Sequence, residues 1–127
     1  MQVNWNEISV TITDYILSGF SFLWALELFR MKVSDERPRR YALLFLMISL
    51  SALVGGTYHL IHPSLPPAGA EGLWKLTQVL IACAALVLLN IFLGEFQTRI
   101  NPLGRLVALT FGAVSFSFIL FAWDNFL

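Results

Sequence analysis

The stretch YALLFLMISLSALVGGTYHLIH, residues 41–62, is an apolar segment that ends with the two histidines of the chain, His59 and His62. An apolar helix of about 20 residues, rising 1.5 Å per residue, crosses the hydrocarbon core of a bilayer. Three further segments of similar character cover about residues 10–31, 73–96 and 103–123. The sequence therefore predicts one domain over residues 1–127: an all-α integral membrane protein, an antiparallel bundle of four transmembrane helices.

The composition agrees with a membrane protein. Hydrophobic residues make up 57% of the chain and charged residues 13%, with a mean hydropathy of +0.73, whereas soluble domains carry about 25% charged residues. The net charge is zero, and no basic segment interleaved with aromatic residues points to a nucleic-acid partner. The single cysteine, Cys83, cannot form an internal disulfide. The start MQVNWNEIS lacks the basic region of a signal peptide, so we expect the first segment to be retained.

Basic residues are distributed unequally between the two ends of the predicted bundle. The connections at residues 32–40 and 97–105, with their flanks, contain Arg30, Lys32, Arg37, Arg39, Arg40, Arg99 and Arg105. The opposite end contains Lys75. The positive-inside rule therefore places both connections in the cytoplasm and both termini outside, in what we expect to be a bacterial inner (cytoplasmic) membrane. Trp5, Trp74 and Trp123 then lie near the outer interface, where an aromatic belt is expected.

Polar and ionisable side chains gather at the outer ends of all four predicted helices. They are Asp14, Tyr15, Tyr58, His59, His62, Glu71, Lys75, Thr77, Gln78 and Asp124. A smaller set lies at the inner end: Glu27, Arg30, Asn90, Glu95 and Arg99. Because an unpaired charge in hydrocarbon is expensive, we expect the inner Glu27 and Glu95 to form structural ion pairs with nearby arginines.

The second helix carries a coherent stripe. Ser51, Gly55, His59 and His62 are four, four and three residues apart, which places them on one face. Small residues on such a face let a helix or a flat ligand approach closely. We expect a ligand-binding site formed by Gly55, Tyr58, His59, His62 and Asp14. Asp14 has a second interpretation, as a first-turn carboxylate after an N-cap residue, favoured by the helix dipole.

A zinc site is one interpretation of the outer layer. His59 and His62 are candidate zinc ligands, with Asp14 or Glu71 as general base or further ligand. The segment GGTYH resembles the metal-binding segment of the CREST membrane hydrolases, the alkaline ceramidase and progestin/adipoQ-receptor group. This resemblance implies intramembrane lipid or amide hydrolysis with His59 on the metal. It covers about ten residues, has Gly55 at the family's serine position, offers only Glu71 for the downstream aspartate, and lacks the family's two later histidines.

Two other interpretations remain open beside the one that we favour. Gly55 four residues before His59 resembles the small-x-x-x-His pattern of light-harvesting polypeptides, which implies a tetrapyrrole, haem or bacteriochlorophyll, on the histidine. A proton-coupled transporter would relay protons through Asp14, His59 and Glu27.

The interpretation we favour is a non-enzymatic accessory or ligand-binding subunit of a larger membrane complex, or a homo-oligomer. The short loops support it, as do the aromatic residues of the fourth segment, which can face lipid or a partner. These are Phe111, Phe116, Phe118, Phe121 and Phe126. Close helix packing is expected at Gly55, Gly56, Ala84, Ala85, Gly112 and Ala113.

Overall fold

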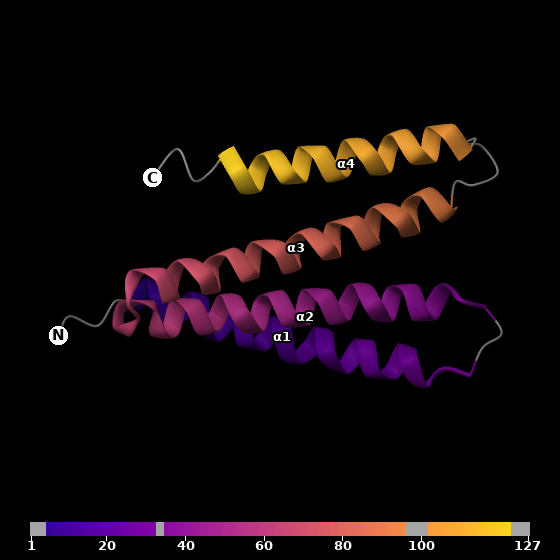
Figure 1. Cartoon of the computed structure of the whole chain (residues 1–127). Helices are drawn as coiled ribbons and strands as arrows, with labels where there is room; N and C mark the ends of the chain where they lie inside the picture. Colours follow the sequence, from indigo (N-terminus) through magenta and orange to yellow (C-terminus); the bar gives the residue numbers. More distant parts are fainter. Residues whose placement is uncertain (1–4, 33–34, 96–101, 123–127) are drawn as a thin grey trace.

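The computed structural model describes residues 5–32, 35–95 and 102–122, which form four α-helices and one 3₁₀ turn (Figure 1). The elements are α1 (Trp5–Arg30), α2 (Arg37–Ile61), η1 (His62–Ser64), α3 (Pro67–Glu95) and α4 (Pro102–Ala122). By length and composition, α1, α2 and α3 can each span a membrane. In α4 the apolar segment within the described residues, Pro102–Val114, is shorter than a span. The all-α fold is therefore confirmed for the described residues, and three of the helices are long and apolar enough to span a membrane.

Helix α1 begins at Trp5, ahead of the predicted start at residue 10. Its early polar residues continue the helix because their hydroxyls find partners within it, as where Thr13 donates to the Ser9 carbonyl at 2.9 Å. Asp14 consequently lies in about the third turn. The interpretation of Asp14 as a first-turn residue following an N-cap at Thr13 is therefore wrong.

The connection between α2 and α3 is shorter than the sequence predicts. Residues 63–72 were expected to lie outside a helix, but α3 already begins at Pro67. Proline is well tolerated at a helix start, where its missing N–H would have no partner. The amides of Gly69 and Ala70 donate to the Pro66 carbonyl at 2.9 and 3.1 Å. Glu71 therefore lies within α3.

Helices α1 and α2 pack through small and hydroxyl-bearing side chains. The buried residues of α1 follow one helical stripe: Thr11, Ser18, Ser21 and Ala25. Ser49 of α2 donates to the Ser18 carbonyl at 3.0 Å, and the two hydroxyl oxygens are 3.3 Å apart. Lipid is as apolar as leucine, so close packing and hydrogen bonds hold membrane helices together where the hydrophobic effect cannot.

Helices α2, α3 and α4 continue the arrangement in chain order. Leu44, Ala84 and Ile91 form an apolar cluster between α2 and α3. Gly112 of α4 lies against α3, since a Cβ there would stand 3.0 Å from Leu89 Cδ2. Among the described residues, each helix makes its main contacts with the next helix in the chain, and α4 lies apart from α1 (Figure 1). The helices thus form an open antiparallel row instead of a closed four-helix bundle.

Four of the six small residues expected at helix contacts lie in such positions: Gly55, Gly56, Ala84 and Gly112. The other two, Ala85 and Ala113, are exposed. Their exposure follows from the open row, because α3 and α4 each keep faces that no neighbouring helix covers.

At Gly56, α2 approaches α1 closely. A Cβ at Gly56 would lie 3.0 Å from Asp14 Cβ and 3.2 Å from the Tyr15 ring, whereas a Cβ at Gly19 would meet nothing within 4 Å. We predict that Gly56→Leu lowers the free energy of unfolding by about 1–3 kcal/mol through overpacking. Gly19→Leu, the matched control, should leave it unchanged or slightly higher. Equilibrium unfolding in mixed detergent micelles, followed by circular dichroism, measures both; equal losses would contradict this packing.

Candidate functional site

His59 forms the central polar contact at the end of the molecule where α2 meets η1. Its Nδ1 lies 2.7 Å from Glu7 Oε2 on α1, and the two side chains are 26% and 33% exposed. The contact is a hydrogen bond if the imidazole is neutral and an ion pair if it is protonated. It joins the start of α1 to the last turn of α2, so it closes the helical hairpin at this end.

Glu7 is the functional residue that the sequence interpretation missed. It precedes the predicted first span, so it was counted with the N-terminal segment instead of with a helix. A signal was present: Glu7 and Asp14 are seven residues apart, so both belong to the same face of any helix that includes them. Extending the helix backwards by one turn would have placed Glu7 opposite the end of α2.

The second histidine has different neighbours. The His62 ring stacks on Tyr58 at a centroid distance of 4.9 Å, and Tyr58 contacts Trp74 of α3 at 5.2 Å. Tyr58 also meets the edge of the His59 ring at 5.4 Å. His62 Nδ1 is buried without a hydrogen-bond partner in the described part of the chain. His59 thus turns to α1 while His62 belongs to an aromatic cluster with α3, although both were expected on one face.

Asp14 lies at the junction of three helices. Its Oδ2 would be 3.6 Å from a Cβ at Gly55, and the same Cβ would be 3.4 Å from Thr77 Cγ2 of α3. Gly55 is therefore a packing residue between α1 and α3. The carboxyl that holds His59 is Glu7, two helical turns or about 10 Å along α1 from Asp14.

Glu71, the other candidate ligand or general base of the outer layer, pairs with a lysine of its own helix. Glu71 accepts from Lys75 Nζ at 2.6 Å one turn further along α3, and both side chains are largely exposed. No group of three His, Cys, Asp or Glu side chains that could hold a metal ion occurs among residues 5–32, 35–95 and 102–122. Asp124 and Trp123 lie outside the described residues.

The inner charged residues form surface ion pairs. Arg30 Nη1 lies 3.2 Å from Glu27 Oε1 within α1. Glu95 Oε1 at the end of α3 lies 3.8 Å from Arg37 Nε at the start of α2. Arg99, the other arginine expected near Glu95, lies outside the described residues. Exposed pairs of this kind contribute little to stability.

The Glu7–His59 arrangement has a defined chemical capacity. A carboxylate on one imidazole nitrogen fixes the ring orientation and, in the neutral ring, leaves the proton on that nitrogen. Nε2 of His59, which has no hydrogen-bond partner within the described residues, then presents a lone pair, or an N–H when the ring is protonated. Such a nitrogen can accept from, donate to or coordinate a group that approaches the outer end of the hairpin.

We predict that Glu7→Gln and His59→Gln each lower the free energy of unfolding by about 1–3 kcal/mol. The first replaces the carboxylate of this partly buried contact with a neutral amide, and the second removes the imidazole. The double variant should cost less than the sum of the single variants. The matched control is Glu71→Gln, which breaks an exposed pair and should cost at most about 0.5 kcal/mol. Additive losses in the Glu7–His59 cycle would show that the two side chains do not interact.

Comparison with known proteins places the chain in a family without giving a function. One family, described as a family of unknown function (DUF6962), matches residues 9–127. No curated protein and no solved structure matches the chain. The matched residues include His59, Gly55 and Asp14, while Glu7 lies just before them. Because the match covers nearly the whole sequence, the chain belongs to the DUF6962 family of unknown function.

Proposed function

We propose that the protein is a non-enzymatic accessory subunit of a larger membrane complex, which binds a partner or ligand at its outer surface through His59. The observation that carries this proposal is the 2.7 Å contact between His59 Nδ1 and Glu7 Oε2. It orients an imidazole that is still 26% exposed and leaves Nε2 available. The long apolar helices with short connections support a subunit that works within the bilayer.

The geometry gives less support to the other interpretations. A zinc hydrolase of the CREST type needs at least three metal ligands, and no such group occurs in the described part of the chain. A tetrapyrrole on His59 would use the space over Gly55, but Asp14 and Thr77 already occupy it. A proton relay from Asp14 to Glu27 would have to cross about 20 Å of helix, through the buried serines of α1.

Photo-crosslinking in native membranes tests the binding role. A benzophenone amino acid replaces Leu60, the residue next to His59, whose exposed fraction is 56%. The control places the same amino acid at Leu23 in α1, whose exposed fraction is 60%. We expect a defined adduct from Leu60 that His59→Gln abolishes and Glu7→Gln weakens, and whose mass identifies a protein or small-molecule partner. An adduct pattern that is the same at both positions, or unaffected by His59→Gln, would refute the proposal. Stoichiometric zinc or a Soret band in the purified protein would favour the hydrolase or the tetrapyrrole interpretation.

We also propose that all four helices cross the membrane, with the arginine-rich connections in the cytoplasm. The supporting observation is that the end of α1 at Arg30 and the start of α2 at Arg37 lie opposite the end that contains η1 (Figure 1).

In a Cys83→Ser background, Gly72→Cys should react with a membrane-impermeant maleimide on intact cells, because a side chain at Gly72 meets open space. Glu36→Cys, at the other end of α2, should react only after the membrane is permeabilised. Labelling with the opposite preference would invert the proposed orientation.

A further inference from the structure

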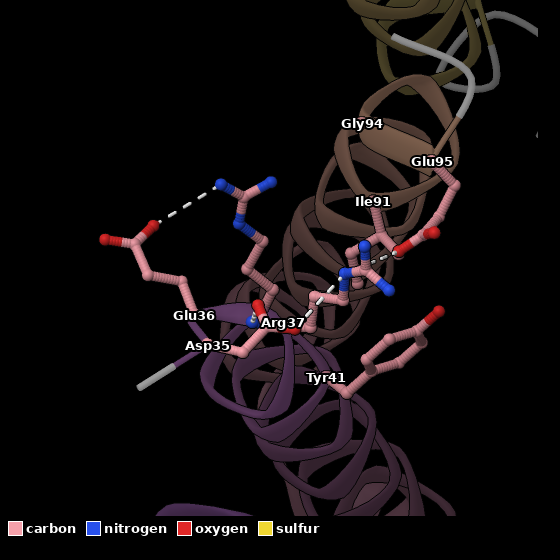
Figure 2. Close-up of a pocket in the computed structure, with 8 residues that line it drawn as sticks. Asp35, Glu36, Arg37, Tyr41, Ile91, Gly94 and Glu95 are labelled. Carbon is pink, nitrogen blue, oxygen red and sulfur yellow. Dashed lines mark hydrogen bonds and ion pairs between the residues drawn. The ribbon is translucent and has the colours of Figure 1, made fainter. Parts of the chain in front are cut away.

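Two adjoining cavities lie at the arginine-rich end of the helices, away from His59. The first has a volume of about 460 Å³ and lies between the start of α2 and the end of α3 (Figure 2). The second has a volume of about 700 Å³ and lies between α2, α3 and α4. Arg40 and Ile91 line both cavities, so the two spaces lie next to each other. Each is within the size range of small-molecule binding sites.

The first cavity, which we call the charged pocket, has walls of both signs. Two guanidinium groups, Arg37 and Arg40, come from the first turn of α2. Three carboxylates, Asp35, Glu36 and Glu95, also line the cavity, and the Tyr41 side chain lies on the side of Glu95, opposite Glu36 (Figure 2). The ion pairs that line the pocket measure 3.3 to 3.8 Å, and the one that crosses from α2 to α3, Arg37–Glu95, is the longest. All five charged side chains remain at least 42% exposed. These groups are therefore available to an incoming polar group.

The second cavity, which we call the apolar groove, is lined mainly by aliphatic side chains. Leu43 of α2, Leu86 and Val87 of α3 and Leu109 of α4 form most of its wall. From Glu95 to Leu86 the lining runs roughly 14 Å along α3, from the helix end into an apolar, membrane-spanning segment. Arg40 lies where the two spaces meet, and a Cβ at Gly94 would stand 3.2 Å from its Nη1, so the glycine lets the guanidinium lie against α3.

We propose that the charged pocket and the apolar groove together bind one zwitterionic aminophospholipid, a phosphoethanolamine lipid of the leaflet at this end. A charged pocket at the helix ends followed by an apolar groove along a span matches the shape of a lipid, whose headgroup is polar and whose acyl chain is not. Arg37 and Arg40 would bind the phosphate, because guanidinium groups form paired hydrogen bonds to phosphate oxygens. The primary ammonium would donate to Glu95 and its neighbouring carboxylates.

The charge pattern distinguishes this occupant from other lipids. An anionic headgroup without an amine would meet three carboxylates and only two guanidinium groups, so repulsion would oppose it. A trimethylammonium headgroup carries the positive charge but has no N–H to donate to a carboxylate. The ethanolamine headgroup has both a phosphate and an N–H-donating cation. This site is independent of His59, which lies at the other end of α2.

Lipid retention tests the proposal. The purified chain is placed in nanodiscs with equal amounts of phosphatidylethanolamine, phosphatidylcholine and phosphatidylglycerol, released into detergent, and the lipids that remain bound are counted by native mass spectrometry. We expect one phosphatidylethanolamine per chain, and Arg40→Gln to lower its retention by about tenfold because one charge-assisted contact is lost. Arg30→Gln is the matched control, since Arg30 also forms an exposed arginine–glutamate pair at this end but lines neither cavity.

A second variant pair tests the apolar groove with both arginines intact. Ala113→Phe fills the groove from an exposed position on α4, whereas Val107→Phe on the same helix lies outside it. Only Ala113→Phe should reduce retention, with helicity unchanged by circular dichroism. Equal retention of the three lipids, preference for phosphatidylglycerol, or equal behaviour of the variants and their controls would each overturn the proposal. None of these outcomes bears on the crosslinking at Leu60, so the two proposals fail separately.

Discussion

The contact on which the rest of the structure depends is the approach of α1 to α2 at Gly56. Without a side chain at this position, the Asp14 Cβ and the Tyr15 ring can lie directly against the backbone of α2. A helix pair in lipid gains nothing from burying apolar surface, so its stability comes from contact distance and from hydrogen bonds that need that distance. Along α1, the Gly56 contact at Asp14 and Tyr15 lies between two polar contacts to α2. The Glu7–His59 contact lies nearer the start of α1, and the Ser18–Ser49 hydrogen bonds lie nearer its end.

Helix α2 organises the row because two of its faces are covered by different neighbours. One face carries Ser49, Gly56 and His59 and packs on α1. The other carries Leu44, Tyr58 and His62 and packs toward α3. Gly55 lies between these faces, where Asp14 and Thr77 approach it from opposite helices. Two histidines three residues apart differ in direction by about 60° on a helix, which is enough to give them different partners.

The sequence predicted the presence of the four helices better than the residues at which they begin and end or the helices that they contact. The length of each apolar run was enough to identify four helices, because hydrocarbon thickness sets that length. The start of α1 was missed because Thr13 satisfies its hydroxyl within the helix, so a polar stretch did not mark a boundary. The sequence identified Gly55 as a site of close approach. Whether a ligand or the side chains of two neighbouring helices fill the space there depends on how α2 is rotated about its axis, which the sequence does not determine. Glu7 could not be paired with His59 until α1 was known to include it.

The two ends of the row differ because the chain connects the helices differently at each end. The short η1 turn holds the end of α2 against the start of α3, and there Tyr58, His62 and Trp74 stack closely. At the other end no turn joins α2 to α3, and the two helices separate (Figure 1). Across these diverging ends Arg37 Nε lies 3.8 Å from Glu95 Oε1, while Arg40 pairs at 3.4 Å with Glu36 next to its own helix start, and all four side chains remain exposed. A pocket of loosely paired charges beside an apolar groove is therefore a direct consequence of the connectivity.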